Sequence, residues 1–329
     1  MTWVLLAILA HVGNGVVFIV DKSLLQTKTA IGKPIAYALY SAAFAGLAIA
    51  LVPWAHILIT PFLLQWAFIA GAVHIGALYL FFTAMRAGEP SRVVPIAGSA
   101  VPLFTILFAV TFLGEQFAVK EGFGIAALLA GGMLLAGFSF PRMRESTHGS
   151  RIKSGMTMLF PVLAGLLFAA YFAITKYIYS YAEGQFLGIF IVTRVVEAVI
   201  AGAGILVFIR PFSLHREKAG KRVSSRSRNP LSRSLPIQGE RKTWATSLVF
   251  LCNKSLAAGA FLLQTYAISL GSVSVVNALQ GVQYAFVLVL ALIVSLFFPK
   301  IFKEEVGTGP VMQKIAGIVL VSFGVALLV

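Results

Sequence analysis

The chain has 329 residues, of which 59% are hydrophobic and 11% are charged; in a soluble domain these fractions are about 45–50% and about 25%. A chain of this length cannot bury so much apolar surface in one water-soluble core, so the composition excludes a soluble enzyme and predicts a membrane protein. The net charge of +15 would indicate a nucleic-acid partner in a soluble chain. Here the basic residues lie between apolar segments, so we attribute the charge to membrane topology and expect no nucleic-acid partner.

Ten apolar stretches are long enough to cross about 30 Å of hydrocarbon, which takes about 20 helical residues. In chain order they lie at residues 3–21, 35–53, 63–86, 91–113, 120–140, 155–179, 185–209, 244–269, 273–298 and 311–329. They predict an all-α integral membrane protein of ten transmembrane helices, with no extramembrane domain.

The basic residues predict how the chain is oriented. Of the 26 Lys and Arg residues, 22 lie in odd-numbered connections between these spans, two lie in even-numbered ones, and Arg194 and Lys254 lie inside spans. Because cytoplasmic connections carry the excess of Lys and Arg, we expect both termini outside, in a plasma (inner) membrane. The long connection at 210–243 is rich in Ser and Arg, which predicts a flexible basic loop, with attraction to anionic lipid as the alternative.

The two halves of the chain resemble one another. At a shift of 193 residues, Gly124 and Gly131 in the fifth span fall on Gly317 and Gly324 in the tenth. Each half holds five spans, and because five is odd, the halves must enter the membrane in opposite senses. Such inverted repeats place a substrate site near the bilayer midplane, and alternating access exposes that site to each side in turn.

We therefore expect two inverted five-helix repeats, residues 1–146 and residues 152–329, the second of which includes the basic loop. Chance similarity among apolar helices is the alternative to duplication.

Short motifs make the chain similar to the EamA-type transporters of the drug/metabolite transporter superfamily. Residues 112–117 read Phe-Leu-Gly-Glu-Gln-Phe and precede a glycine-rich helix that runs to Gly137, and Lys22 and Lys176 close the first helix of each half. In the second half, residues 298–300 read Phe-Pro-Lys where the family pattern has Leu-Gly-Glu. The resemblance covers the whole chain and implies export or exchange of small metabolites. It also implies cytoplasmic termini, whereas we follow the charge count, which places them outside.

Three charged residues inside the predicted spans are candidates for substrate binding. An ionisable side chain at the bilayer centre costs about 2.5 to 3.5 kcal/mol, so each needs a partner, a cavity or a function. Arg194 and Glu197 are three residues apart on one helix face and can pair, either as an anion anchor with its orienting partner or as a structural ion pair. Lys254 lies about ten residues inside the eighth span. The sum of these three charges is +1, which favours an anionic or zwitterionic substrate.

A polar stripe follows the ninth span. Asn277, Gln280, Gln283 and Tyr284 are spaced by 3, 3 and 1 residues, so they share one helix face. We expect this face to line a substrate pathway, with interhelical hydrogen bonding as the alternative.

Two histidines lie in the middle of spans and can titrate near neutral pH. His74 in the third span and His11, with Asn14, in the first are candidates to carry a coupling proton or to contact substrate; packing histidines are the alternative. No His or Cys pair has the spacing of metal ligands, so we expect no metal site.

The sequence thus predicts a secondary transporter that moves a small polar, anionic or zwitterionic metabolite by alternating access, with protons as the candidate coupling ion. There is no HExxH, P-loop or dinucleotide-binding motif, so we expect neither an enzyme with catalytic residues nor a cofactor. The alternative is a flippase or translocase for a phosphorylated lipid carrier, which a lateral opening between helices would favour. Expected partners are the metabolite, membrane lipids and protons, for a monomer or a homodimer.

Overall fold

The computed structural model of the chain describes residues 2–25, 32–87, 90–135, 151–181, 185–209, 237–283, 286 and 308–328. These residues are almost entirely helical and include no strand. The helices are α1 (Thr2–Leu25), α2 (Pro34–Ala43), the 3-10 helix η2 (Phe44–Trp54), α3 (Pro61–Ala87), α4 (Pro90–Phe112), α5 (Val119–Leu135), α6 (Arg151–Tyr181), α7 (Phe186–Phe208), α9 (Ile237–Leu270), α10 (Val273–Ala278) and α12 (Thr308–Leu328).

The described helices are those of a multi-pass integral membrane protein. Six stretches are long and apolar enough to cross a membrane: Thr2–Leu25, Pro34–Trp54, Pro61–Arg86, Leu159–Tyr181, Phe186–Phe208 and Thr246–Leu270. Large apolar side chains face outward, such as Leu5 at 67% and Val199 at 66% exposure, while Arg194 and Glu197 are buried. This distribution is the reverse of that in a soluble protein and fits a lipid surround. The count of ten spans stays a prediction, because most of the predicted ninth span lies outside the described residues.

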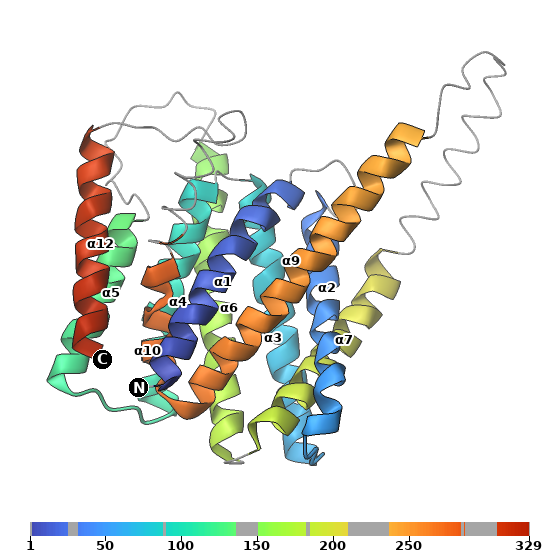
Figure 1. Cartoon of the computed structure of the whole chain (residues 1–329), viewed down its shortest axis with the longest axis horizontal. Helices are drawn as coiled ribbons and strands as arrows, with labels where there is room; N and C mark the ends of the chain where they lie inside the picture. The colour runs from blue at the N-terminus through green and yellow to red at the C-terminus, as the bar shows by residue number, and fades with distance from the viewer. Residues whose placement is uncertain are drawn as a thin grey trace.

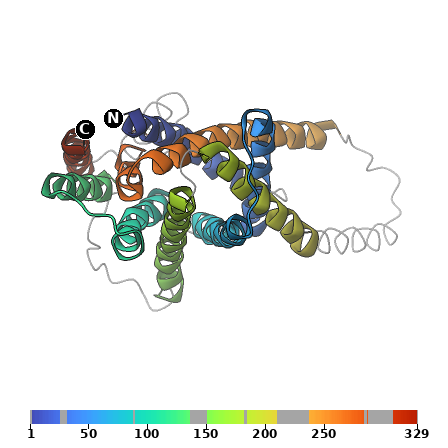
Figure 2. The same ribbon diagram turned by 90° about the horizontal axis from the view of Figure 1, so that it is seen from below.

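The helices pack as one bundle around α3, α6, α7 and α9 (Figure 1). Helix α9 runs obliquely along one side of the bundle with α1 against it, and α3 packs against both α6 and α7 (Figure 2). Helices α5 and α12 form a pair at one edge. The start of α1 and the end of α12 lie at the same end of the bundle (Figure 1).

The pairing of α5 with α12 depends on glycine. A Cβ atom on Gly131 would come within 2.8 Å of the Gly317 carbonyl oxygen, and one on Gly324 would come within 2.8 Å of the Gly124 carbonyl oxygen. Small residues let helix backbones approach this closely, and the resulting packing drives association in membranes. The four glycines are those that match at the shift of 193, and the two contacts exchange when the repeats are exchanged.

Three of the predicted spans differ from the helices in ways that affect the site. Helix α1 continues to Leu25, so Asp21 lies inside the helix and not at its end. The second span is α-helical only to Ala43 and then continues as a 3-10 helix with Pro53 near its end. Helix α9 begins at Ile237, ahead of the predicted start at 244 and within the stretch expected to be a loop.

Candidate functional site

A cavity of about 370 Å³ lies inside the bundle and contains most of the predicted site residues. Eight of its lining residues are phenylalanines, so the interior is largely apolar. Eight of the ten predicted residues line it: His11, Asn14, His74, Arg194, Glu197, Lys254, Gln280 and Gln283. Asn277 does not line it, and Tyr284 lies outside the described residues.

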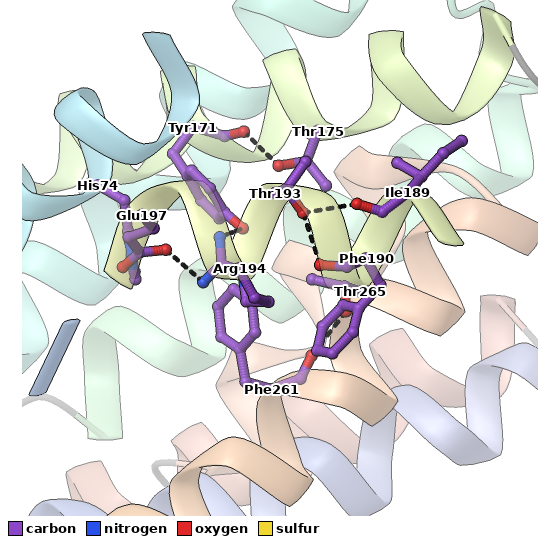
Figure 3. A network of polar contacts seen from close by, with 10 residues as sticks. All are labelled: His74, Tyr171, Thr175, Ile189, Phe190, Thr193, Arg194, Glu197, Phe261 and Thr265. Atoms are coloured by element: carbon purple, nitrogen blue, oxygen red, sulfur yellow. Dashed lines mark hydrogen bonds and ion pairs between the residues drawn. The ribbon is translucent and has the colours of Figure 1, made fainter. Parts of the chain in front are cut away.

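The predicted pairing of Arg194 with Glu197 is present, and two further residues join it. Arg194 Nη1 lies 2.6 Å from Glu197 Oε2, and Arg194 Nη2 donates to the Tyr171 hydroxyl at 2.6 Å. His74 Nδ1 lies 2.6 Å from the other Glu197 oxygen, Oε1. Figure 3 shows Arg194 between Glu197 and Tyr171, with the ring of Phe261 beside its guanidinium; the guanidinium carbon is 4.6 Å from that ring's centroid. We call His74, Tyr171, Arg194 and Glu197 the arginine cluster.

Close packing of α3 on α7 brings His74 to Glu197. A Cβ atom on Gly71 would lie 3.1 Å from the Glu197 Cα atom, so a larger residue here would push the two helices apart. Gly71 precedes His74 by three residues and therefore lies on the same face of α3. The sequence reading placed His74 mid-span but did not connect it to Glu197, because the two residues are far apart in the chain.

Lys254 has a carboxylate partner that the sequence analysis missed. Its Nζ atom lies 2.8 Å from Asp21 Oδ1. The same oxygen accepts hydrogen bonds from the Tyr37 hydroxyl at 2.5 Å and from Asn253 Nδ2 at 2.6 Å. The Lys254 ammonium also lies over the Tyr37 ring, 4.6 Å from its centroid. We call Asp21, Tyr37, Asn253 and Lys254 the lysine cluster.

Asp21 changes the charge balance of the cavity. It is the chain's only aspartate, it is 3% exposed, and it lines the cavity. With Asp21 included, the four charges Asp21, Arg194, Glu197 and Lys254 sum to zero. The predicted sum of +1 was therefore incomplete, because it left out Asp21, which also lines the cavity.

Amide side chains and His11 form a third polar region. His11 Nε2 lies 2.8 Å from the Val276 carbonyl oxygen, and its Nδ1 lies 3.3 Å from Gln283 Oε1. Asn14 donates to Gln264 Oε1 at 3.2 Å. Gln283 Nε2 has no hydrogen-bond partner among the described residues although Gln283 is 1% exposed. A buried donor without a partner at a cavity wall is suited to donate a hydrogen bond to an acceptor group of a ligand.

The predicted polar stripe divides into two parts. Asn277 is 1% exposed, accepts a hydrogen bond from Gln264 and donates one to Thr105, so it links helices away from the cavity. Gln280 and Gln283 line the cavity. The division arises because α10 ends at Ala278 and Leu279 has turn geometry, so the stripe does not follow one continuous helix.

Glu115 of the Leu-Gly-Glu motif holds the start of α10. Its Oε2 accepts from Ser272 Oγ at 2.8 Å and its Oε1 accepts from the Val273 backbone N–H at 3.0 Å. On the other side of this turn, Lys176 Nζ donates to the carbonyl oxygens of Ile268 and Gly271, at 3.0 and 2.8 Å. The carboxylate at a helix start and the ammonium at a helix end complement the helix dipoles. The two family-like residues therefore fix the α9–α10 turn.

We expect Glu115→Gln to lower the free energy of unfolding by about 1.5 to 3 kcal/mol, since it weakens two hydrogen bonds to a charged acceptor. Thermal unfolding of the purified protein in detergent measures the loss. Glu121→Gln is the matched control, because Glu121 at the start of α5 is also a half-buried carboxylate, and it accepts from the Ala118 N–H of its own segment and not from another helix. Equal losses for the two variants would contradict the role assigned to Glu115.

The fold and the cavity define a multi-pass membrane protein with two clusters of charged side chains at a largely apolar cavity between its helices. Residues 1–137 match the model of the EamA-like transporter family. Over 75 residues the chain is 36% identical to a protein of Sinorhizobium sp described as "Uncharacterized transporter in cobO 3'region", which covers 22% of this chain and 52% of that protein. The chain thus spans about half the length of this curated relative. The similarity to EamA-type transporters is confirmed for residues 1–137.

A solved protein, described only as "Crystal structure of protein", has the same fold. The two superpose with a TM-score of 0.61 over 99% of this chain and 94% of the other, at 14% sequence identity. At this identity the likeness concerns the fold alone.

Proposed function

We propose that the protein is a secondary transporter that moves a small zwitterionic metabolite across the plasma (inner) membrane by alternating access. The observation that carries the proposal is the meeting of two charge-balanced clusters at one cavity. Each cluster offers one cationic and one anionic group, which a zwitterion can bind by exchanging partners with them. The phenylalanines of the wall would contact the apolar part of the same substrate.

The arrangement of the helices supports alternating access. Each cluster joins the first half of the chain to the second: His74 to Glu197 in one, and Asp21 to Lys254 in the other. The contacts of Gly131 with Gly317 and of Gly324 with Gly124 exchange when residues 1–146 and 152–329 are exchanged, which supports an inverted repeat. In such transporters the site lies between the repeats, and one repeat rocks against the other.

His74 and Glu197 are the groups proposed to carry a coupling proton. Glu197 faces His74 on α3 and Arg194 on its own helix, and Arg194 in turn contacts Tyr171 on α6. Protonation of Glu197 would release Arg194 for a substrate carboxylate, which would couple proton binding to substrate binding.

Thermal-shift screening of the purified protein tests the proposal. The ligand classes are amino acids and other zwitterions, sugar phosphates, nucleotides and lipid phosphates. A ligand that binds only the folded state at 100 times its Kd adds about 2.7 kcal/mol of stability. We expect zwitterions to raise Tm and Glu197→Gln to remove the shift. Stabilisation by anionic lipid phosphates alone would favour the flippase, and no shift by any zwitterion would contradict the proposal.

The flippase for a phosphorylated lipid carrier is the second candidate. It requires a route from the cavity into the bilayer, and the cavity has lining residues that are exposed on the membrane-facing surface. The charge balance opposes it, because a phosphate group carries about 1.5 to 2 negative charges, whereas the four buried charges of the cavity sum to zero.

A further inference from the structure

Part of the cavity wall is formed by exposed residues of two stretches that can cross the membrane. Among the described lining residues, those classed as exposed are Leu47 and Ala50 of η2 and Gly259 of α9. Both elements belong to stretches that can cross the membrane, Pro34–Trp54 and Thr246–Leu270, and Gly259 lies near the middle of the second. An opening at this depth faces hydrocarbon and not water.

The 3-10 geometry of η2 makes one wall of the opening. With three residues per turn, side chains three apart lie above one another. Two adjoining columns therefore face the cavity, one formed by Phe44, Leu47 and Ala50 and the other by Ala45, Ala48 and Leu51; all six line it. The third column faces away, with Ile49 at 62% exposure. A 3-10 stretch of this length is uncommon and often marks a functional segment.

Small residues of α9 make the opposite wall. Ala257, Ala258 and Gly259 all line the cavity, and a Cβ atom built on Gly259 would have no atom within 4 Å. Helix η2 packs chiefly against α7 and only lightly against α9, so few contacts close the seam between η2 and α9. We call Leu47, Ala50, Ala258 and Gly259 the lateral portal.

We propose that the lateral portal admits a single-chain amphiphile with a zwitterionic head group, whose head binds between the arginine and lysine clusters while its alkyl chain extends through the portal into the bilayer. The proposal rests on the proposed function and names the substrate class of the same site. The charge sum of zero suits a head group that carries both charges. The eight phenylalanines of the wall can contact the first carbons of the alkyl chain. The portal lets the rest of the alkyl chain stay in hydrocarbon, so that it is not transferred into water.

Photolabelling in lipid nanodiscs tests the portal. The probe is a lysophosphatidylcholine with a photoreactive diazirine in its acyl chain, and labelled peptides are identified by mass spectrometry. We expect labels on η2 and α9 around the lateral portal. Gly259→Phe would fill the opening and lower labelling there about tenfold, which corresponds to a loss of about 1.4 kcal/mol in the binding free energy of the probe.

Gly202→Phe is the matched control. A Cβ atom on Gly202 of α7 also meets nothing within 4 Å, and Gly202 does not line the cavity. Both substitutions replace a helical glycine by a residue with a higher helix propensity, so neither is expected to prevent folding. We expect the Gly202→Phe variant to be labelled at the lateral portal as strongly as the wild type. Equal labelling of both variants would overturn the portal, and so would equal labelling at the portal by a two-chain phosphatidylcholine probe, which would indicate ordinary surrounding lipid.

The thermal shift by short zwitterions separates this proposal from the proposed function. If short zwitterions stabilise the wild type while the lysolipid labels the portal no more than the outer face of α7, the portal is wrong and the transporter stands. If no zwitterion, short or long, stabilises the wild type, the transporter proposal itself fails.

Discussion

Glu197→Gln is expected to lower the transport rate about 100-fold and to destabilise the protein by about 3 to 5 kcal/mol, because it leaves the Arg194 charge buried without its carboxylate. Arg194 is 4% exposed and Glu197 is fully buried, so water cannot replace the lost partner. The transport rate is measured as uptake into proteoliposomes of the zwitterion that gives the largest thermal shift. Stability is measured by thermal unfolding of the purified protein.

The double variant Arg194→Met/Glu197→Leu separates a structural role from a functional one. Replacing a buried ion pair by apolar side chains of similar volume is often neutral or stabilising. We therefore expect the double variant to regain most of the lost stability and none of the transport. Recovery of both would show that the pair only holds the helices together, and would remove Arg194 and Glu197 from the binding site.

Asp21→Asn is expected to cost about 3 to 5 kcal/mol, since it removes the charge that balances buried Lys254. Lys254 is 5% exposed, and Asp21 Oδ1 is the shared acceptor for Lys254, Tyr37 and Asn253. Asparagine keeps an acceptor oxygen of similar shape, so the change isolates the charge. Thermal unfolding with and without the zwitterion measures both the loss of stability and the loss of the ligand-induced shift.

Lys254→Met added to Asp21→Asn is the companion variant. It removes the unbalanced ammonium, so we expect a stability closer to that of the wild type than the single variant has, while the ligand-induced shift stays absent. A double-mutant cycle gives the coupling energy between the two residues. A coupling energy near zero would contradict the pairing of Asp21 with Lys254.

Local patterns predicted the features that depend on neighbours in the chain. The length of apolar runs predicted a multi-pass helical protein, and the spacing of three residues predicted the pairing of Arg194 with Glu197. The glycine match at a shift of 193 marked Gly131 and Gly324, which the structure places at close helix contacts. These signals survive without tertiary information because helix geometry alone determines which side chains share a face.

The partner of Lys254 could not be found in this way. Asp21 is 233 positions away in the sequence and lies at the edge of the predicted first span, next to Lys22. Because Asp21 is the chain's only aspartate, it was a candidate partner for a buried cation. The sequence could not pair it with Lys254, because the depth of Asp21 in the membrane depends on how far α1 continues. The same holds for His74. Its residue type is visible in the sequence, but its contact with Glu197 depends on the approach of α3 to α7 at Gly71.

The sequence by itself determined that this protein is a membrane-embedded helical bundle with charged residues inside it, because hydrophobicity, length and helical period are properties of consecutive residues. Only the tertiary structure decided that those charges balance in two clusters, that Asn277 links helices instead of lining the cavity, and that η2 and α9 both line the cavity. Each of these depends on which surfaces of distant helices meet, and such contacts are set by packing across the bundle.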